Sequence, residues 1–202
     1  MAKRYGLVID LERCIGCHSC RIACKVENNI NTGSGIRVET VGGPHRDTPL
    51  GKFPQLSMYY LPTPCMHCAK PPCLDACPLE AIYKREDGIV LVDEEKCNGC
   101  QACIPACPYD ALIYNPERDI VQKCSLCAQR IDQGLEPFCV LCCETEAMFF
   151  GDLDDPASEV SQIILRKGAY ILHPEKGTKP AIYYCPVSKP GIVQEVKASD
   201  TR

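Results

Sequence analysis

The stretch Cys14-Ile15-Gly16-Cys17-His18-Ser19-Cys20-Arg21-Ile22-Ala23-Cys24 places four thiols within eleven residues, and the rest of the chain is organised around such groups of cysteines. The same spacing returns later in the chain, and two looser quartets complete the set. The other three quartets are Cys65, Cys68, Cys73 and Cys77; Cys97, Cys100, Cys103 and Cys107; and Cys124, Cys127, Cys139 and Cys143. The order along the chain is therefore tight, loose, tight, loose.

The tight spacing is that of the bacterial ferredoxin run Cys-x2-Cys-x2-Cys-x3-Cys. In that run three cysteines hold one [4Fe–4S] cluster and the fourth ligates a second cluster. Three closely spaced thiolates wrap one face of a cubane, while the fourth lies beyond a short turn and points away. Four quartets therefore predict four cubanes in two pairs, and a protein that moves single electrons.

Cysteine makes up 18 of the 202 residues, which in a secreted mini-protein would indicate disulfides. The N-terminus lacks the apolar core of a signal peptide, and thiols two residues apart are better placed to share a metal. Zinc sites usually take two close cysteines from each of two separate loops, so a zinc-binding interaction module is a weaker alternative. Cys142 and Cys185 exceed the sixteen thiolates of four cubanes and are expected to be buried free thiols.

The net charge of −4 understates the charge of the loaded protein. Each oxidised cubane with four thiolates carries about two negative charges, so four would bring the total to about −12. Nucleic-acid binding needs a basic face and is excluded on this ground. No apolar run approaches the length of a membrane span, so no direct membrane crossing is expected.

Local patterns predict short strands and helices between the quartets. Acidic residues at 152–155 followed by Pro156 indicate a helix start, and apolar residues at helical spacing follow them. Gly33-Ser34-Gly35 is predicted to form a turn. Strands are predicted at 5–10, 36–41, 55–61, 81–83, 111–114, 147–150, 169–172 and 181–184, helices at 19–28 and through Val160, Ile163 and Ile164, and a frayed end at 197–202.

An internal repeat relates the two halves of the chain. Residues 8–14 (Val-Ile-Asp-Leu-Glu-Arg-Cys) match residues 91–97 (Leu-Val-Asp-Glu-Glu-Lys-Cys), and residues 72–81 parallel residues 138–147. The predicted fold class is therefore α+β, with two bacterial 2[4Fe–4S] ferredoxin-like modules related by the repeat. A helix and strands after residue 152 would form a C-terminal strap.

Three cations, Arg13, Lys96 and Lys123, each directly precede the first cysteine of a quartet. A cation beside an anionic cluster favours the reduced form and raises its potential; the alternative is a solvated surface charge. His18 and His67 lie inside cysteine loops, where complete quartets make them redundant as ligands, so hydrogen-bonding or surface roles are expected.

Tyr83, Tyr109 and Tyr114 are expected to pack around the cubanes and exclude water. The sequence contains no nucleophile–base pair, no glycine-rich phosphate loop and no flavin fingerprint. We therefore predict no catalytic residue and a chain that is not itself an enzyme.

The quartets and the tail together resemble a known family. Gly151-Asp152-Leu153-Asp154-Asp155-Pro156, Gly177-Thr178-Lys179-Pro180 and Tyr183-Tyr184 are similar to segments of the four-cluster, ferredoxin-like electron-transfer subunit of the dimethyl sulfoxide reductase family of molybdopterin oxidoreductases. The resemblance implies a relay between a large molybdenum- or tungsten-containing catalytic subunit and a quinone-linked membrane subunit or a soluble carrier. The alternative is a stand-alone polyferredoxin or a hydrogenase-linked carrier, which the sequence from residue 151 onward argues against.

The resemblance also implies which cysteines share a cluster, because in this family the outer quartets pair and the inner quartets pair. A tandem pairing, first with second and third with fourth, fits the spacing nearly as well. The implied sets are Cys14, Cys17, Cys20 and Cys143 (cluster 1); Cys24, Cys124, Cys127 and Cys139 (cluster 2); Cys65, Cys68, Cys73 and Cys107 (cluster 3); and Cys77, Cys97, Cys100 and Cys103 (cluster 4).

The corresponding domains are an outer module of residues 1–50 and 118–152, an inner module of residues 51–117, and an extension of residues 153–202. Glu144 departs from the family pattern, which has proline there, and Cys142 is an addition; both concern the backbone around Cys143. Residence in the cytoplasm, or outside it by export with a signal-bearing partner, fits the sequence equally well.

Overall fold

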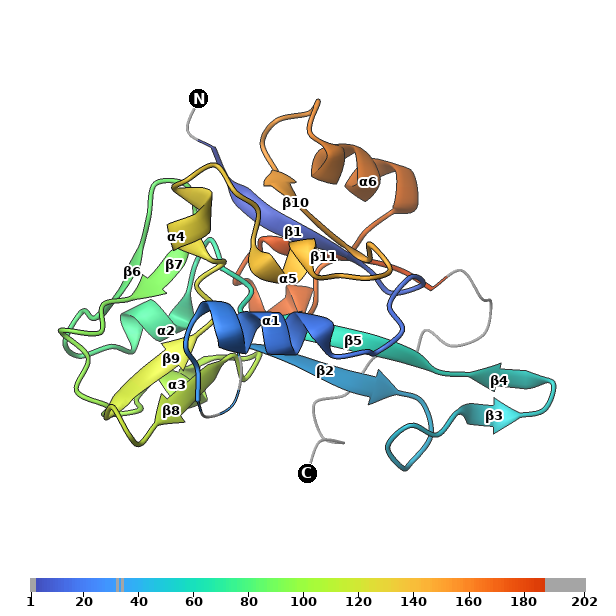
Figure 1. The fold of residues 1–202 in the computed structure, drawn as a ribbon, viewed down its shortest axis with the longest axis horizontal. Coiled ribbons are helices and arrows are strands. Elements are labelled where there is room, and N and C mark those ends of the chain that lie inside the picture. Colours follow the sequence, from blue (N-terminus) through green and yellow to red (C-terminus); the bar gives the residue numbers. More distant parts are fainter. Residues whose placement is uncertain (1–2, 32, 34, 188–202) are drawn as a thin grey trace.

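A three-stranded sheet joins the start of the chain to its end (Figure 1). In this computed structural model, which describes residues 3–31, 33 and 35–187, the central strand β1 (Tyr5–Asp10) pairs antiparallel with β10 (Met148–Asp152) and parallel with β11 (Ile182–Cys185). Residues 6–10 of β1 are buried. The first quartet begins just after β1 and the fourth ends just before β10, so this pairing brings the two quartets to one end of the sheet.

The other strands form two-stranded antiparallel ribbons. The β3–β4 ribbon projects from the body of the molecule (Figure 1) and carries Phe53, which is 88% exposed, at its turn. The ribbons are β2 (Ile36–Val41) with β5 (Tyr59–Pro64), β3 (Leu50–Lys52) with β4 (Gln55–Ser57), β6 (Ile82–Lys84) with β7 (Val90–Val92), and β8 (Leu112–Asn115) with β9 (Ile120–Lys123).

Most helices are single turns around the cysteine loops. The two longer ones are α1 (Ser19–Glu27), which carries Cys20 and Cys24, and α6 (Glu159–Lys167). Ser158 caps α6 by accepting the Ser161 N–H, and Gly168 ends it at φ 59°. The short helices are α2 (Pro72–Asp75), α3 (Cys103–Ala106), α4 (Ala128–Ile131), α5 (Phe138–Leu141) and the 3₁₀ turn η1 (Pro174–Lys176).

The same turn leads into both tight quartets. The Asp10 carboxylate accepts the Glu12 N–H at 3.1 Å, and its carbonyl accepts the N–H of Cys14. Asp93 repeats both contacts with Glu95, at 3.1 Å, and Cys97. The similar sequences before Cys14 and Cys97 therefore have similar local hydrogen bonding.

Two expected strands differ from the structure. The predicted strand at 55–61 is divided at Met58, because β4 turns back onto β3 while β5 pairs with β2. Residues 169–172 form no strand: they contribute one isolated bridge between Tyr170 and Tyr184, and the chain then turns at His173, whose φ is 50°. The expected frayed end at 197–202 lies outside the described residues.

Cys185 is fully buried on β11, where it packs with Val8 and Val160, as expected for a surplus thiol. Cys142 is half-buried, at the end of α5. α6 covers this side of the sheet and brings Lys167 to Asp10 at 2.6 Å. The Asp10 side chain is 1% exposed, so its charge depends on that lysine and on the Glu12 N–H.

Replacing Lys167 with methionine should lower the free energy of unfolding by about 2 kcal/mol, because a buried carboxylate would lose its cation. Thermal unfolding of the anaerobic protein should show a melting temperature several degrees lower, with Lys167→Arg near wild type. An unchanged melting temperature in Lys167→Met would show that this ion pair does not stabilise the sheet.

Candidate metal centres

All eighteen cysteines are free thiols. Sixteen of them fall into four groups of mutually interacting neighbours. In the first group, burial raises the pKa of Cys20 to about 12, with further contributions from Cys14, Cys143 and Cys17. Burial likewise raises the pKa of Cys14, which also senses Cys143 and Cys17. The first three thiols of quartet one therefore lie beside the last thiol of quartet four.

The second group takes its single thiol from quartet one. Burial raises the pKa of Cys139, and the neighbouring Cys124, Cys127 and Cys24 raise it further. Burial also raises the pKa of Cys24 to about 11, with Cys127 as the thiol that adds to the shift. Quartets one and four are thus interleaved.

The third and fourth groups interleave quartets two and three in the same way. Burial raises the pKa of Cys73 to about 12, with contributions from Cys65, Cys107 and Cys68. Burial raises the pKa of Cys103 to about 11, with Cys77, Cys97 and Cys100 as its neighbours. Those four thiols line a small apolar cavity, which Leu79 and Val121 help to close.

The four groups follow one another in a row. Cys20 of the first group interacts with Cys139 of the second, and Cys124 of the second with Cys65 of the third. Helices α2 and α3 contact each other and connect the third group to the fourth. Cys17 at one end of the row and Cys100 at the other are exposed, whereas the second group is buried throughout.

In the described part of the chain, no three His, Cys, Asp or Glu side chains converge on a site for a single metal ion. A cubane instead binds its four thiolates one to each iron, at separate corners. Every ligand must be deprotonated to bind iron. Burial raises the pKa of these thiols, so iron has to displace protons that the buried thiols would otherwise keep.

A left-handed residue precedes the second cysteine of every quartet. These residues are Gly16 (φ 68°), His67 (φ 42°), Gly99 (φ 66°) and Leu126 (φ 54°). Alternation of right- and left-handed residues turns successive N–H groups toward one point and makes an anion-binding concavity, as at many iron–sulfur sites. Glycine adopts this conformation without strain, and the loose quartets impose it on His67 and Leu126.

The fourth cysteine of each quartet accepts an amide N–H. Ala81 donates to the Cys77 sulfur at 3.3 Å and Ala147 to Cys143 at 3.2 Å, and Ala111 lowers the pKa of Cys107 in the same way against the larger effect of burial. In these three quartets the donor lies four residues after the cysteine. For Cys24, Gly35 is the donor.

Gly35 belongs to the site although its stretch is predicted to be an ordinary turn. A Cβ at this position would lie 2.8 Å from the Cys24 sulfur and 3.1 Å from the Cys124 backbone. Only glycine brings its amide this close to both quartets. Quartets two, three and four each lead within four residues into a predicted strand, whereas a predicted helix continues past Cys24. This difference was the available signal that the amide donor to Cys24 comes from elsewhere.

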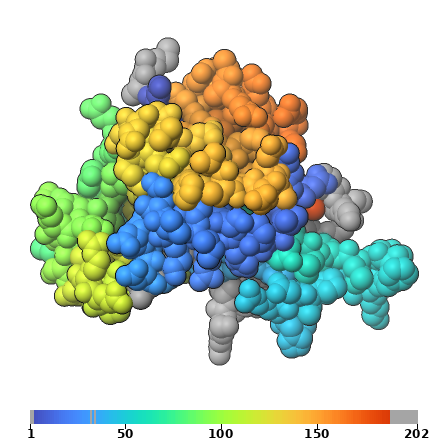
Figure 2. Space-filling view, in the orientation of Figure 1, coloured from blue at the N-terminus to red at the C-terminus, as the bar shows by residue number. Residues whose placement is uncertain are grey.

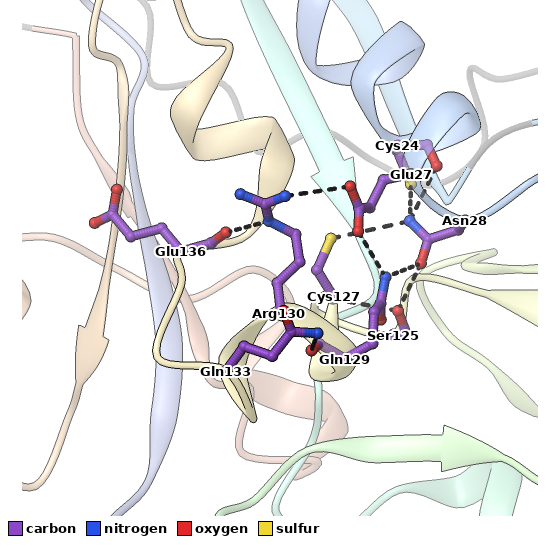
Figure 3. A network of polar contacts seen from close by, with 9 residues as sticks. All are labelled: Cys24, Glu27, Asn28, Ser125, Cys127, Gln129, Arg130, Gln133 and Glu136. Carbon is purple, nitrogen blue, oxygen red and sulfur yellow. Dashed lines mark hydrogen bonds and ion pairs between the residues drawn. The ribbon is translucent and has the colours of Figure 1, made fainter.

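Asn28, directly after α1, links quartets one and four (Figure 3). Its amide nitrogen lies 3.8 Å from the Cys24 sulfur and 3.9 Å from the Cys127 sulfur, and its oxygen accepts from Ser125 at 2.9 Å. Glu27 and Arg130 form an ion pair beside it at 3.4 Å. Figure 2 shows the blue segment of α1 packed against the gold residues around α5, which α1 also contacts.

The three cations before the quartets differ sharply in burial. Arg13 pairs with Glu146 at 3.2 Å and Lys96 with Asp93 at 3.5 Å, and their side chains are 41% and 62% exposed. Lys123 is buried, and its ammonium group donates to the carbonyl oxygens of Val90 and, at 3.0 Å, of Cys124. Among the described residues it forms no ion pair with a carboxylate.

Two buried residues beside the third group, Lys123 and His67, are only partly satisfied by protein partners. Lys123 carries a charge that influences Cys73 and Cys124, and the His67 Nδ1 accepts the Val90 N–H at 3.0 Å, which leaves a buried Nε2 without a partner. A buried cation is costly unless an anion lies near it. These residues therefore fit an anionic cluster with sulfur acceptors.

The histidine and tyrosine residues predicted to lie near the cubanes differ in where the structure places them. The His18 Nδ1 is buried without a partner in the first cysteine loop. Tyr109 is buried beside the third group, whereas Tyr83 is 44% exposed and the Tyr114 hydroxyl donates to Asp119 at 2.8 Å. The prediction that Tyr83 shields a cubane is wrong, because β6 lies in a two-stranded ribbon and turns this side chain outward.

Comparisons with known proteins identify the cysteine loops as parts of 4Fe-4S domains. Residues 56–153 match the family described as a 4Fe-4S dicluster domain, and residues 5–26 match a 4Fe-4S binding domain. The chain is 46% identical to the iron-sulfur subunit of a putative dimethyl sulfoxide reductase of Halobacterium salinarum, over 89% of this chain and 78% of the relative. It is 42% identical to a subunit of the sulfite dehydrogenase of Allochromatium vinosum (91% and 83%) and 40% identical to a subunit of the tetrathionate reductase of Salmonella typhimurium (90% and 72%).

The cysteine loops and these domains define a [4Fe–4S] protein that transfers electrons. The chain belongs to the family of ferredoxin-like iron–sulfur subunits of the dimethyl sulfoxide reductase family of molybdopterin oxidoreductases. These relatives give no support to a stand-alone polyferredoxin or a hydrogenase-linked carrier. None of the helices in the described residues is long and apolar enough to cross a membrane.

Replacing Gly35 with alanine should remove most of one cluster, because the new methyl group would occupy the space between Cys24 and Cys124. Iron analysis of the anaerobic protein should show a loss of about four iron atoms, the content of one cubane. Gly134→Ala is the control: its Cβ would meet no atom within 4 Å, so only the strain of φ 75° is added. Equal iron contents in the two variants would contradict this role for Gly35.

Proposed function

We propose that the chain holds four [4Fe–4S] clusters and relays single electrons between a molybdenum- or tungsten-containing catalytic subunit and a second redox partner. The second partner is a quinone-linked membrane subunit or a soluble carrier, and the chain itself performs no substrate chemistry. The proposed ligands are Cys14, Cys17, Cys20 and Cys143; Cys24, Cys124, Cys127 and Cys139; Cys65, Cys68, Cys73 and Cys107; and Cys77, Cys97, Cys100 and Cys103.

The interleaving of quartets one and four carries this proposal. Cys143 is a neighbour of Cys14 and Cys20, and Cys24 is a neighbour of Cys127 and Cys139. The tandem alternative would need Cys24 beside quartet two. The contacts of Asn28 with Cys24 and Cys127 support the nested set from a side chain that is not itself a ligand.

We assign residues 1–50 and 118–152 to an outer ferredoxin-like module and residues 51–117 to an inner one, related by the internal repeat. Pairing of β1 with β10 supports the outer module, and the contact of α2 with α3 supports the inner one. The extension from residue 153 acts as a strap: α6 lies over the sheet, and β11 extends it.

The row of thiol groups defines the path along which electrons would pass through the chain. Bound clusters would supply one-electron oxidation and reduction, and the chain keeps the second group buried while the terminal groups reach the surface at Cys17 and Cys100. Partners would exchange electrons at these ends.

A stable complex with a large molybdenum- or tungsten-containing subunit on purification supports the proposal, and a free monomer contradicts it.

Replacing Cys24 with serine should damage the cluster held by Cys124, Cys127 and Cys139, because Cys24 would be its fourth ligand. Electron paramagnetic resonance of the reduced protein should show the loss or conversion of one signal, with about four fewer iron atoms if the cluster is lost. Cys142→Ser, next to Cys143, should keep all four clusters.

The companion variant Cys14→Ser identifies which signal belongs to cluster 1. If Cys24→Ser removes the same signal as Cys14→Ser and no other, the nested pairing is wrong. Stoichiometric zinc with far fewer than sixteen iron atoms in the wild-type protein would overturn the four-cluster proposal itself.

Of the three cations, Lys123 is the one that we propose tunes potential, because it is buried between Cys73 and Cys124. A buried positive charge favours the more negative, reduced cluster. Lys123→Met should therefore lower the midpoint potentials of clusters 2 and 3, measured by redox titration with paramagnetic resonance. Lys96→Met, at an exposed site, should change none of the four; equal effects of both variants would contradict the assignment.

A further inference from the structure

The extension that begins at residue 153, called the tail here, is attached to the loop that carries Cys68. The Ala69 N–H donates to the Lys179 carbonyl at 2.8 Å, and the Lys70 N–H donates to the Thr178 carbonyl at 3.0 Å. The Ala181 N–H donates to the Met66 carbonyl at 2.9 Å. These three bonds fix a tail segment more than one hundred residues away in sequence against both sides of Cys68.

The attachment buries the Thr178 hydroxyl beside the third thiol group. Thr178 is 3% exposed, and its Oγ1 lies 2.6 Å from the Tyr109 hydroxyl, which is also 3.3 Å from the Leu172 carbonyl. Tyr109 is itself 4% exposed and comes from the segment after Cys107. Burial raises the pKa of Cys68 to about 11, and Thr178 is the side chain that acts against this shift.

We propose that Thr178 donates its hydroxyl proton in a hydrogen bond to the Cys68 sulfur and raises the potential of the cluster bound by Cys65, Cys68, Cys73 and Cys107. Tyr109 acts as the positioning residue by donating to Thr178. The inference rests on the proposed ligand set for that cluster. It makes the tail a tuning element for one cluster as well as a strap.

The direction of these hydrogen bonds follows from charge. An iron-bound thiolate has no proton to give, so it can only accept, and a bond to a charged acceptor is stronger than one to a neutral carbonyl. Thr178 therefore donates its single hydroxyl proton to Cys68. The 2.6 Å contact between the two hydroxyls then needs the Tyr109 proton, so Tyr109 donates to Thr178 and not to the more distant Leu172 carbonyl at 3.3 Å. Reduction adds negative charge to the cluster and strengthens the donated bond, which favours the reduced form.

Three variants test the proposal in the holoprotein. Thr178→Val keeps the shape of the side chain and removes the donor, and Tyr109 keeps an acceptor in the Leu172 carbonyl. Thr178→Ser retains the hydroxyl and is the matched control. Tyr109→Phe leaves Thr178 in place but removes the group that orients it.

Redox titration followed by paramagnetic resonance should show that Thr178→Val lowers one midpoint potential. The ratio of reduced to oxidised cluster at a fixed potential should fall by up to about tenfold, which is 59 mV for one electron. The affected cluster should be the one lost in Cys68→Ser. Thr178→Ser should restore the wild-type value, and Tyr109→Phe should give a smaller shift in the same direction.

Four unchanged potentials in Thr178→Val, or a shift of a cluster that survives Cys68→Ser, would overturn the proposal. Loss of about four iron atoms in Thr178→Val would also overturn it, because the role of Thr178 would then be structural. If the Cys68→Ser variant keeps all four clusters, the proposed ligand set itself is wrong. This outcome separates failure of the proposed function from failure of the inference about Thr178.

Discussion

Three thiolates from one short loop can bind only one face of a cubane, and the fourth ligand must come from another part of the chain. The rest of the structure depends on this constraint. In each quartet the helical turn after the third cysteine points the fourth away from the first three, toward another quartet. β1 is central in its sheet because it carries the chain into quartet one while β10 carries it out of quartet four. The order of the thiol groups in space therefore differs from the order of the quartets along the chain.

Charge is the second constraint. Four anionic clusters in a chain that is already acidic would repel one another, and burial removes the water that would screen them. The structure meets this with backbone amides aimed at cysteine sulfurs and with one buried ammonium group, Lys123, between the second and third groups. Arg13 and Lys96 occupy equivalent positions in the sequence, yet they lie at the surface and pair with carboxylates. Position before a quartet therefore does not determine whether a cation reaches a cluster.

Much of the arrangement followed from local signals. The quartets, β1, α1 and β2 could be read directly, since ligand spacing and strand or helix patterns are short-range properties. Long-range features could not. Gly35 looks like any turn glycine until its amide is found beside Cys24, and the tail gave no sign that Thr178 lies beside Cys68. The division of the strand at Met58 and the absence of one at 169–172 were set by which partner strand was available, which no local pattern records.

Anomalous scattering at the iron edge, from crystals grown without oxygen, would show which quartets share clusters. Interleaved quartets would give four iron clusters in a row, with the first bound by residues 14–20 and Cys143 and the second by Cys24 and residues 124–139. A cluster bound jointly by the first and second quartets would contradict this interleaving.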